Sequence, residues 1–250
     1  MHNDDRPVGR VLTRREVLAL MGMSGAAILA GCRPSRDGAA AVATTAAAGD
    51  VAFPACVVLP EQTEGPYFVD LPLDRADIRS DPGTSAAKPG VPLAMAFRVS
   101  RVDGSSCAPI AGARVDVWHC DAQGIYSDVE DPSFNTKGQR FLRGYQLTDA
   151  SGMARFTTIY PGWYRGRTVH IHFKVRTEPT AQRGQEFTSQ LYFDDVVSDR
   201  IFQHSPYEAG ARTRNAQDGI FRRNGEQLLV PVKEAGSGYE AMLDLGMRMA

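Results

Sequence analysis

Two histidines separated by one residue, His170 and His172, lie in a stretch of alternating character at residues 168–175. Because side chains alternate faces along a β-strand, both imidazoles should point the same way, with Cα atoms roughly 6–7 Å apart. Two imidazoles placed in this way can converge on one metal ion, while the neighbouring apolar side chains bury the opposite face. The pair alone does not establish a metal site, because most His-x-His pairs on strands are surface pairs or satisfied polar pairs.

The residues before the histidines make the pair more specific. Residues 158–172 read Thr-Ile-Tyr-Pro-Gly-Trp-Tyr-Arg-Gly-Arg-Thr-Val-His-Ile-His, with Tyr164 after a Pro-Gly turn and Arg167 three residues before His170. This segment resembles the iron-binding segment of the intradiol dioxygenases, the catechol and protocatechuate ring-cleaving family. The resemblance implies that Tyr164, His170 and His172 are iron ligands. The loop between Tyr164 and Arg167 is several residues shorter than in the protocatechuate enzymes, so the pocket wall there should differ.

Three further segments carry the same resemblance in the family's order. Residues 116–127, Asp-Val-Trp-His-Cys-Asp-Ala-Gln-Gly-Ile-Tyr-Ser, resemble the strand and turn that bear the second tyrosine ligand, which falls on Tyr126. Residues 188–193 resemble the segment with an active-site glutamine, here Gln190, and residues 60–67 resemble the family's entry motif. The resemblance runs from about Phe53 to Leu245 and implies an antiparallel β-sandwich enzyme.

The chemistry of the four side chains agrees with a ferric ion. A free tyrosine has a pKa of about 10 and is a poor ligand at neutral pH, but a bound cation holds the phenolate. Phenolate is a hard, anionic oxygen donor that suits Fe(III), whereas the better-known Fe(II) oxygenase site uses two histidines and a carboxylate. Two tyrosinates and a hydroxide would cancel the three charges of the ion in a partly dry cleft. We therefore expect non-haem Fe(III) held by Tyr126, Tyr164, His170 and His172.

The resemblance also implies an activity. The family uses O2 to cleave a catechol-type aromatic between its two hydroxylated carbons, giving cis,cis-muconate-type diacids. By correspondence of position, Tyr164 would help to remove a substrate proton, Arg167 would stabilise developing negative charge, and Gln190 would help to orient the substrate. Which catechol is cleaved stays open on the sequence.

Other residues with suitable side chains are expected to have structural roles. Tyr160 should line the pocket or lie just behind the ligands, and Trp118 should lie in the core. Tyr67 could line the pocket or simply pack. His119 points to the opposite strand face from Trp118, and the acidic pair at residues 194–195 should form a solvated turn.

Short segments of alternating polar and apolar residues fill the chain after residue 53, with turn signals such as Asp103-Gly104 and Pro161-Gly162 between them. No amphipathic helical pattern of useful length occurs there. Many short strands joined by turns predict an all-β fold, a sandwich of mostly antiparallel strands. The strands expected are 92–99, 113–119, 153–159, 168–175, 187–193, 228–232 and 239–245.

The first residues have the composition of a targeting segment. Arg14 and Arg15 precede an uncharged, mostly apolar run at 17–30, which is too short to span a bilayer core of about 30 Å. This pattern describes a signal peptide and resembles the twin-arginine export signal. Residues 29–32, Leu-Ala-Gly-Cys, resemble a lipobox. We expect an exported, periplasmic or extracytoplasmic protein, with Cys32 either lipidated as a membrane anchor or lost on cleavage.

The predicted organisation is a signal peptide at 1–31, a disordered Ala-rich tether at 32–52 and a catalytic domain at 53–250. Hydrophobic residues make up 43% of the 250 residues and charged residues 23%, which is typical of a soluble globular domain. The net charge of −1 gives no reason to expect nucleic acid as a partner. Oligomeric state stays open.

Three cysteines remain in the predicted domain, and an exported protein can form one disulfide. Cys107 and Cys120 flank one predicted strand, and the extended chain between them holds them too far apart for an S–S bond. Cys56 is therefore the expected partner of one of them, and the sequence does not say which.

Two other functions compete with the enzyme. One is an exported β-sandwich module that binds aromatic compounds or a metal without turnover. The other is a periplasmic Zn or Cu site built on His170 and His172.

Overall fold

The computed structural model describes residues 57–248 with the exception of 105, 179–183 and 208–209. The predicted signal peptide, the tether, Cys32 and Cys56 lie outside the described residues. No helix within the described part of the chain is long and apolar enough to cross a membrane.

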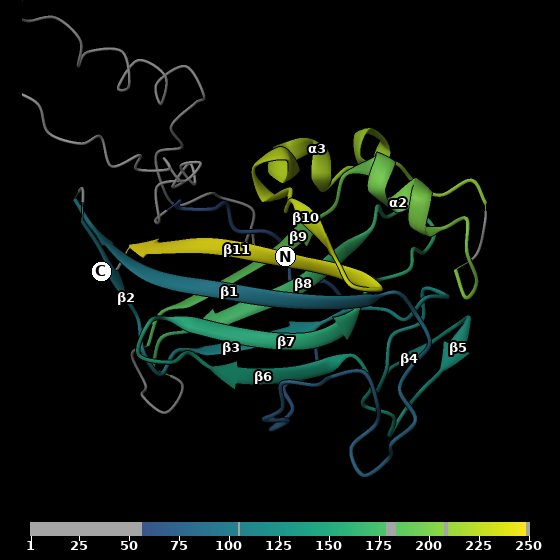
Figure 1. The fold of residues 1–250 in the computed structure, drawn as a ribbon, viewed down its shortest axis with the longest axis horizontal. Coiled ribbons are helices and arrows are strands. Elements are labelled where there is room, and N and C mark those ends of the chain that lie inside the picture. The colour runs from purple at the N-terminus through teal and green to yellow at the C-terminus, as the bar shows by residue number, and fades with distance from the viewer. Residues whose placement is uncertain (1–56, 105, 179–183, 208–209, 249–250) are drawn as a thin grey trace, which may run out of the picture. The chain divides into compact units, whose positions relative to one another are not determined.

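Two sheets form the body of the protein (Figure 1). The five-stranded sheet has the order β10-β11-β1-β2, and β7 also pairs with β1. Its strands are β1 (Pro92–Asp103), β2 (Ser106–Pro109), β7 (Met153–Ile159), β10 (Val232–Ala235) and β11 (Gly238–Arg248). All its pairings are antiparallel except that of β1 with β11, which is parallel.

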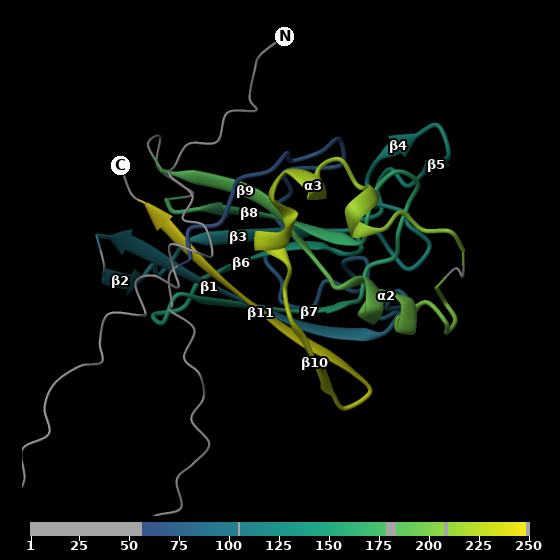
Figure 2. The ribbon, with the colours of Figure 1, turned by 90° about the horizontal axis from the view of Figure 1, so that it is seen from above.

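The four-stranded sheet has the order β6-β3-β8-β9 and is antiparallel throughout. It consists of β3 (Arg114–Trp118), β6 (Arg143–Leu147), β8 (His170–Arg176) and β9 (Glu186–Tyr192). Figure 2 shows these four strands in one layer and β1, β7 and β11 in another. The layers meet through apolar side chains, for example Phe97 of β1 and Phe173 of β8, whose ring centroids are 5.3 Å apart. The predicted β-sandwich is confirmed.

Smaller elements lie outside the two sheets. They are the hairpin of β4 (Glu130–Asp131) and β5 (Phe134–Asn135), the helices α2 (Asp195–Ile201) and α3 (Phe221–Asn224), and the 3₁₀ turns η1 (Asn215–Gln217) and η2 (Gly225–Leu228). The helices α2 and α3 follow β9 along the chain and lie above the sheets in Figure 1.

Most predicted strands are present, and 153–159 coincides with β7. The strand expected at 228–232 is wrong, because η2 occupies its beginning and β10 starts only at Val232. The strand β6 was not predicted; it is short, and its Gly144 has no side chain to show the alternation.

The acidic pair at 194–195 is not a solvated turn. The Asp194 side chain accepts a hydrogen bond from the Val196 backbone N–H and caps α2. Asp195 accepts one from the buried Arg212 at 2.6 Å. A seven-residue helix is too short for its hydrophobic periodicity to be seen in the sequence.

The two described cysteines differ in state. Cys107 is disulfide-bonded, and Cys120 is a buried free thiol. The prediction that these two do not pair with each other is confirmed, and the predicted partner Cys56 is outside the described residues.

Candidate metal centre

Strand β8 places two imidazoles side by side in the interior. His170 and His172 are buried, and their Nε2 atoms are 3.1 Å apart. The alternate residues of the strand, among them Ile171 and Phe173, pack into the main core. The Nδ1 atom of His170 lies 2.6 Å from the carbonyl oxygen of Thr168. When Nδ1–H donates to that carbonyl, the Nε2 lone pair faces the centre, as in metal-binding histidines.

Two tyrosine hydroxyls reach the same point from two loops. The hydroxyl oxygen of Tyr126 lies 3.4 Å from His170 Nε2, and that of Tyr164 lies 3.3 Å from it. Tyr126 is fully buried and Tyr164 half-buried. The structure therefore brings together all four of the side chains expected to hold iron.

A glycine lets the two tyrosine loops touch. Gly124 has a φ of +80°, and a Cβ on it would lie 2.3 Å from the carbonyl oxygen of Trp163. The turn before Tyr126 is held by Asp121, whose carboxylate accepts from the backbone N–H groups of Gln123 and Ile125. The loop that carries Tyr126 is thus packed directly on the chain that leads into Tyr164.

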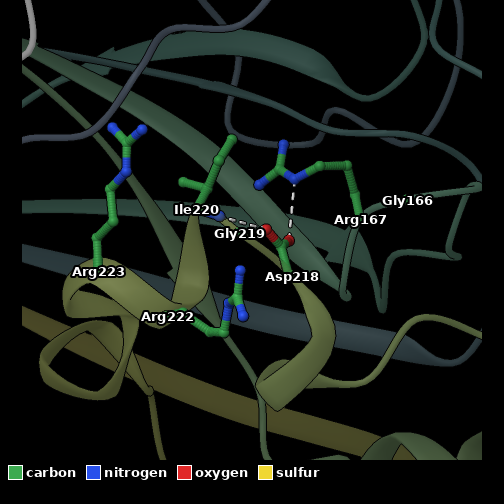
Figure 3. A pocket seen from close by; sticks show the side chains of 7 residues that line it. All are labelled: Gly166, Arg167, Asp218, Gly219, Ile220, Arg222 and Arg223. Atoms are coloured by element: carbon green, nitrogen blue, oxygen red, sulfur yellow. Dashed lines mark hydrogen bonds and ion pairs between the residues drawn. The ribbon is translucent and has the colours of Figure 1, made fainter.

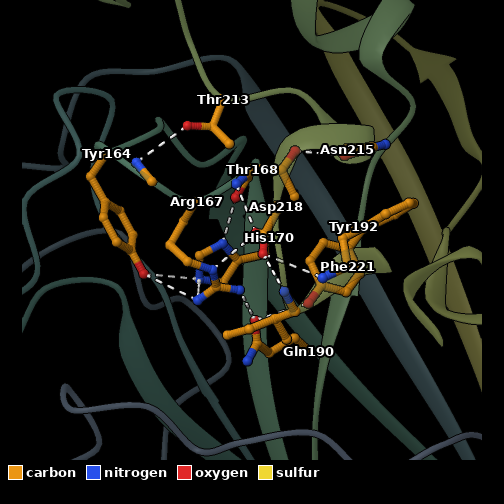
Figure 4. A network of polar contacts seen from close by, with 12 residues as sticks. Tyr164, Arg167, Thr168, His170, Gln190, Tyr192, Thr213, Asn215, Asp218 and Phe221 are labelled. Atoms are coloured by element: carbon orange, nitrogen blue, oxygen red, sulfur yellow. Dashed lines mark hydrogen bonds and ion pairs between the residues drawn. The ribbon is translucent and has the colours of Figure 1, made fainter. Parts of the chain in front are cut away.

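Arg167 lies beside Tyr164 and His170 (Figure 4). Its Nη1 atom lies 3.5 Å from both the Tyr164 hydroxyl and His170 Nε2. Its Nη2 atom donates to Gln190 Oε1 at 2.5 Å, and Gln190 Nε2 donates to the carbonyl oxygen of Thr63 at 2.8 Å. The Arg167 guanidinium therefore contacts the cluster through Nη1 and is held by Gln190 through Nη2.

Asp218 is part of this network and was not predicted. Its Oδ2 atom accepts from Arg167 Nε and from the Thr168 backbone N–H, both at 2.9 Å. The Asp218 carboxylate is buried, and its Oδ1 atom accepts a hydrogen bond from the Ile220 backbone N–H at 2.7 Å. Nothing in the local sequence distinguishes Asp218 from other acidic residues, because its partners lie about fifty positions earlier.

Two aromatic side chains complete the surroundings. Tyr67 stacks on Tyr126 with ring centroids 4.6 Å apart and donates its hydroxyl to Asp131. Trp118 is buried, as predicted, and stacks on the His172 ring at 5.0 Å with an interplanar angle of 9°. Tyr67 thus packs against one of the four ligand candidates, Tyr126, and the core residue Trp118 packs against another, His172.

Two other candidates lie elsewhere. His119 is buried, with Nδ1 2.8 Å from the Cys120 carbonyl oxygen and Nε2 2.7 Å from Thr158 Oγ1. Tyr160 packs in the core against Phe193, with its hydroxyl 2.7 Å from Ser198 Oγ. The hydroxyl of Tyr160 is therefore engaged with α2, and not with the ligand cluster.

Burial keeps the four ligand candidates uncharged in the absence of a cation. It lowers the pKa of His170 to about 3 and lowers the pKa of His172 well below its ordinary value of 6.5. It raises the pKa of Tyr126 well above its ordinary value of 10 and that of Tyr164 to about 12, although the Arg167 charge opposes the shift at Tyr164. Neutral imidazoles are ready to bind a metal, and the phenols need one to ionise.

Comparison with known proteins assigns this chain to a family. The sequence profile of the dioxygenase family matches residues 63–244 of this chain. The chain belongs to the intradiol ring-cleavage dioxygenases. All of the predicted site residues fall inside the matched range.

Individual relatives agree with the family. The chain is 33% identical over 156 residues to "Catechol 1,2-dioxygenase 2" of Acinetobacter lwoffii, covering 54% of this chain and 51% of that protein. It is 32% identical over 151 residues to "Protocatechuate 3,4-dioxygenase beta chain" of Burkholderia cepacia, covering 56% and 63%. The chain thus spans between half and two thirds of these curated relatives.

A solved structure covers more of the chain. It is the "Intradiol ring-cleavage Dioxygenase from Tetranychus urticae", which superposes with a TM-score of 0.65 at 32% identity. The superposition covers 77% of this chain and 95% of that chain. The sandwich described above is therefore the fold of the family.

The family typically uses non-haem Fe(III), and the residues present fit that ion. Donor atoms bound at about 2.1 Å to one ion lie about 3.0–3.6 Å apart when neighbouring ligands subtend right to trigonal angles. The distances from His170 Nε2 to the other three donor atoms, 3.1–3.4 Å, fall in this range. Among the described residues no group of three or more His, Cys, Asp and Glu side chains gathers as a metal site. The cluster described above contains two histidines and two tyrosines.

Proposed function

We propose that this chain is an intradiol dioxygenase that uses non-haem Fe(III) and O2. Its substrate is a catechol-type aromatic, cleaved between the two hydroxylated carbons to a cis,cis-muconate-type diacid. The observation that carries the proposal is the convergence of two phenol oxygens and two imidazole Nε2 atoms in one buried cluster. The ligands proposed are Tyr126, Tyr164, His170 and His172.

The ferric ion, when bound, supplies the Lewis acidity that binds a catecholate and makes it reactive toward O2. Tyr164 is the proposed acceptor of a substrate proton. Its ring is half-buried whereas that of Tyr126 is fully buried, so Tyr164 is the ligand that an incoming substrate can reach. The Arg167 guanidinium, 3.5 Å from the Tyr164 hydroxyl, favours the phenolate form that accepts the proton.

Arg167 and Gln190 act together in this proposal. Arg167 keeps its positive charge beside the cluster, where it stabilises negative charge that develops on the substrate oxygens. The amide oxygen and nitrogen of Gln190 both have protein partners, Arg167 and Thr63. We infer that Gln190 orients the substrate through Arg167, by fixing where the guanidinium points.

The test is an iron-loaded preparation with three measurements: bound iron, the visible spectrum and O2 uptake with catechols. Tyrosinate-to-Fe(III) charge transfer should make the protein red-brown, whereas a Zn protein would be colourless. Tyr164→Phe and His172→Ala should lose iron or activity, with O2 uptake falling at least about a hundred-fold, the scale of losing one catalytic group. Tyr160→Phe is the matched control, since the Tyr160 hydroxyl lies 2.7 Å from Ser198 Oγ of α2 and is not part of the ligand cluster.

Either of two results would overturn the proposal. One is stoichiometric iron without the visible band, which would exclude tyrosinate ligands. The other is full O2 uptake in Tyr164→Phe or His172→Ala.

A further inference from the structure

Thr168 is a buried residue whose backbone N–H, carbonyl and hydroxyl all have partners (Figure 4). Its carbonyl oxygen lies 2.6 Å from Nδ1 of His170, one of the four proposed ligands. Its backbone N–H donates to Asp218 Oδ2 at 2.9 Å, and its hydroxyl donates to Asn215 Oδ1 at 2.5 Å. The residue that holds His170 is therefore itself held by two side chains of one later segment, residues 215–218.

Thr168 precedes the strand that carries the two histidines. Strand β8 begins at His170, and its register with β9 starts with the pair of His170 and Tyr192. The paired residues of β8 and β9 therefore do not include Thr168. The direction of the Thr168 carbonyl depends instead on the contacts that its own backbone N–H and hydroxyl make.

The side chain of Asn215 has a fixed orientation. Its Nδ2 atom donates to the carbonyl oxygen of Phe193, the residue that follows β9, at 2.9 Å. Because a carbonyl can only accept, the amide nitrogen must face Phe193 and the amide oxygen must face Thr168. The Asn215 backbone N–H donates to Asp195 Oδ2 at 3.2 Å, at the start of α2. Asn215 thus joins Thr168 to the end of β9 and to α2.

Asp218 holds the backbone of Thr168 but also has other partners. Its carboxylate accepts from Arg167 Nε and from the Ile220 backbone N–H (Figure 3). Substitution of Asp218 would therefore disturb Arg167 and Thr168 together. Asn215 gives the cleaner test, because its amide oxygen accepts from the Thr168 hydroxyl.

We propose, on the basis of the metal centre proposed above, that Asn215 is a positioning residue for His170 and acts through Thr168. The hydrogen bond from the Thr168 hydroxyl to Asn215 directs the Thr168 carbonyl at Nδ1 of His170. A fixed acceptor at that place keeps the proton on Nδ1 and leaves the lone pair on Nε2, which faces the other ligand candidates. The 3₁₀ turn η1, far from His170 in the sequence, is thereby part of the support of the metal centre.

The experiment measures two properties of the full chain. The first is which ring nitrogen of His170 carries the proton in the metal-free protein, from the ¹⁵N chemical shifts of labelled histidine, with the signals assigned by their loss in His170→Ala. The second is the dissociation constant of Fe(III), from competition with a chelator. Thr168→Val and Asn215→Leu each remove one side of the hydrogen bond, and Thr168→Ser keeps the hydroxyl. Thr148→Val is the matched control, because the buried Thr148 hydroxyl also forms two hydrogen bonds, on the turn after β6.

In the wild-type protein the His170 proton should be on Nδ1. Thr168→Val and Asn215→Leu should move part of the population to Nε2–H, because a carbonyl that can turn away no longer favours the Nδ1–H tautomer. Both variants should raise the dissociation constant of Fe(III) about ten-fold, the lower end of the effect of residues behind metal ligands. Thr168→Ser should match the wild type in both measurements. Thr148→Val should also match it, whereas a merely structural role would make Thr148→Val and Thr168→Val alike.

The inference is overturned if wild-type His170 carries its proton on Nε2, or if folded Thr168→Val or Asn215→Leu keeps the wild-type proton position. A loss of iron affinity in Thr148→Val equal to that in Thr168→Val also overturns it. Failure of the wild-type protein to bind iron overturns the proposed function instead, and the proton position in the metal-free protein still decides the role of Asn215. If Asn215→Leu does not fold, Thr168→Val decides, because it changes one group at nearly constant shape.

Discussion

At the residue scale, three of the functional side chains are held at the end that faces away from the centre. His170 is held through Nδ1 by the Thr168 carbonyl, and Gln190 through its nitrogen by the Thr63 carbonyl. Arg167 is held through Nε by Asp218. Side chains with one end fixed need little reorganisation when a ligand arrives, which is the physical basis of preorganised electrostatic catalysis.

Asp218 is a positioning residue that acts through Arg167, and Asp218→Asn tests this role. An amide has no charge for the guanidinium, so Arg167 should lose its fixed direction while the iron ligands stay in place. We expect kcat to fall about ten-fold, the scale of one misdirected charge-assisted bond, with iron content and the visible band retained. The free energy of unfolding should fall by about 3–5 kcal/mol, as when one partner of a buried pair is removed.

Asp244→Asn is the matched control, because Asp244 forms a more exposed pair with Arg98 on the other sheet. A wild-type kcat in Asp218→Asn would show that Arg167 does not depend on the carboxylate. Loss of the visible band would show instead that Asp218 supports the ligands.

At the element scale, one strand and two loops carry the four ligand candidates, and the packing of the sandwich fixes the positions of these three segments relative to one another. Strand β8 presents both histidines, and it pairs with β3, where Trp118 lies opposite His172. The turn after β3 carries Tyr126 back over the sheet, where Gly124 allows contact with the chain before Tyr164. The sheets are also joined by a polar link, since His119, just after β3, contacts Thr158 of β7.

The His119 link predicts a pH dependence of stability. Burial lowers the pKa of His119 in the folded protein to about 4, below its ordinary value of 6.5, with Asp121 opposing the shift and Arg143 adding to it. The unfolded chain therefore binds a proton at a higher pH than the folded one. The stability contributed by neutral His119 is complete above pH 6.5 and is lost progressively as the pH falls from 6.5 toward 4.

Urea unfolding of the metal-free protein at pH 7.5 and pH 5.0 measures this contribution. Between pH 7.5 and pH 5.0 the free energy of unfolding should fall by about 1–2 kcal/mol more in the wild-type protein than in His119→Gln. The size of this difference follows because uptake of one proton on unfolding changes the free energy of unfolding by about 1.4 kcal/mol per pH unit. Equal losses in the two proteins would show that His119 is not the group that takes up the proton.

At the scale of the whole molecule, the described residues form a two-sheet sandwich that contains the complete cluster, and the family match lies within it. We propose that the chain is exported, with the segment before residue 53 acting as signal and tether. The proposal rests on the arginine pair Arg14-Arg15, the short apolar run after it and the Leu-Ala-Gly-Cys sequence ending at Cys32.

Cell fractionation of a Gram-negative bacterial host with twin-arginine export tests the anchor and the route separately. The wild-type chain should be extracytoplasmic and sediment with membranes, because a lipid added at Cys32 partitions into the bilayer. Cys32→Ser should reduce the membrane-bound fraction at least about five-fold, and Arg14→Lys with Arg15→Lys should retain the protein in the cytoplasm. The same distribution in wild type and Cys32→Ser would exclude lipidation as the anchor.

Local patterns predicted the strands well and the helices poorly. Strand β7 alternates over seven residues and was predicted at its observed bounds, whereas β6 and α2 are short and lack a clear period. Tyr160 shows that spacing along the chain does not predict where a side chain points. Its position four residues before Tyr164 predicted a place at the pocket, whereas its hydroxyl contacts Ser198 of α2 in the structure.

The sequence by itself determined that His170 and His172 share a face, because the alternation of a strand is a local property of the backbone. It also supplied the four donor side chains and their order along the chain. Only the tertiary structure decided that Asp218 holds Arg167 and that Tyr67 stacks on Tyr126. These contacts join residues far apart in the chain, and their formation depends on how the sheets and the segments that follow them pack.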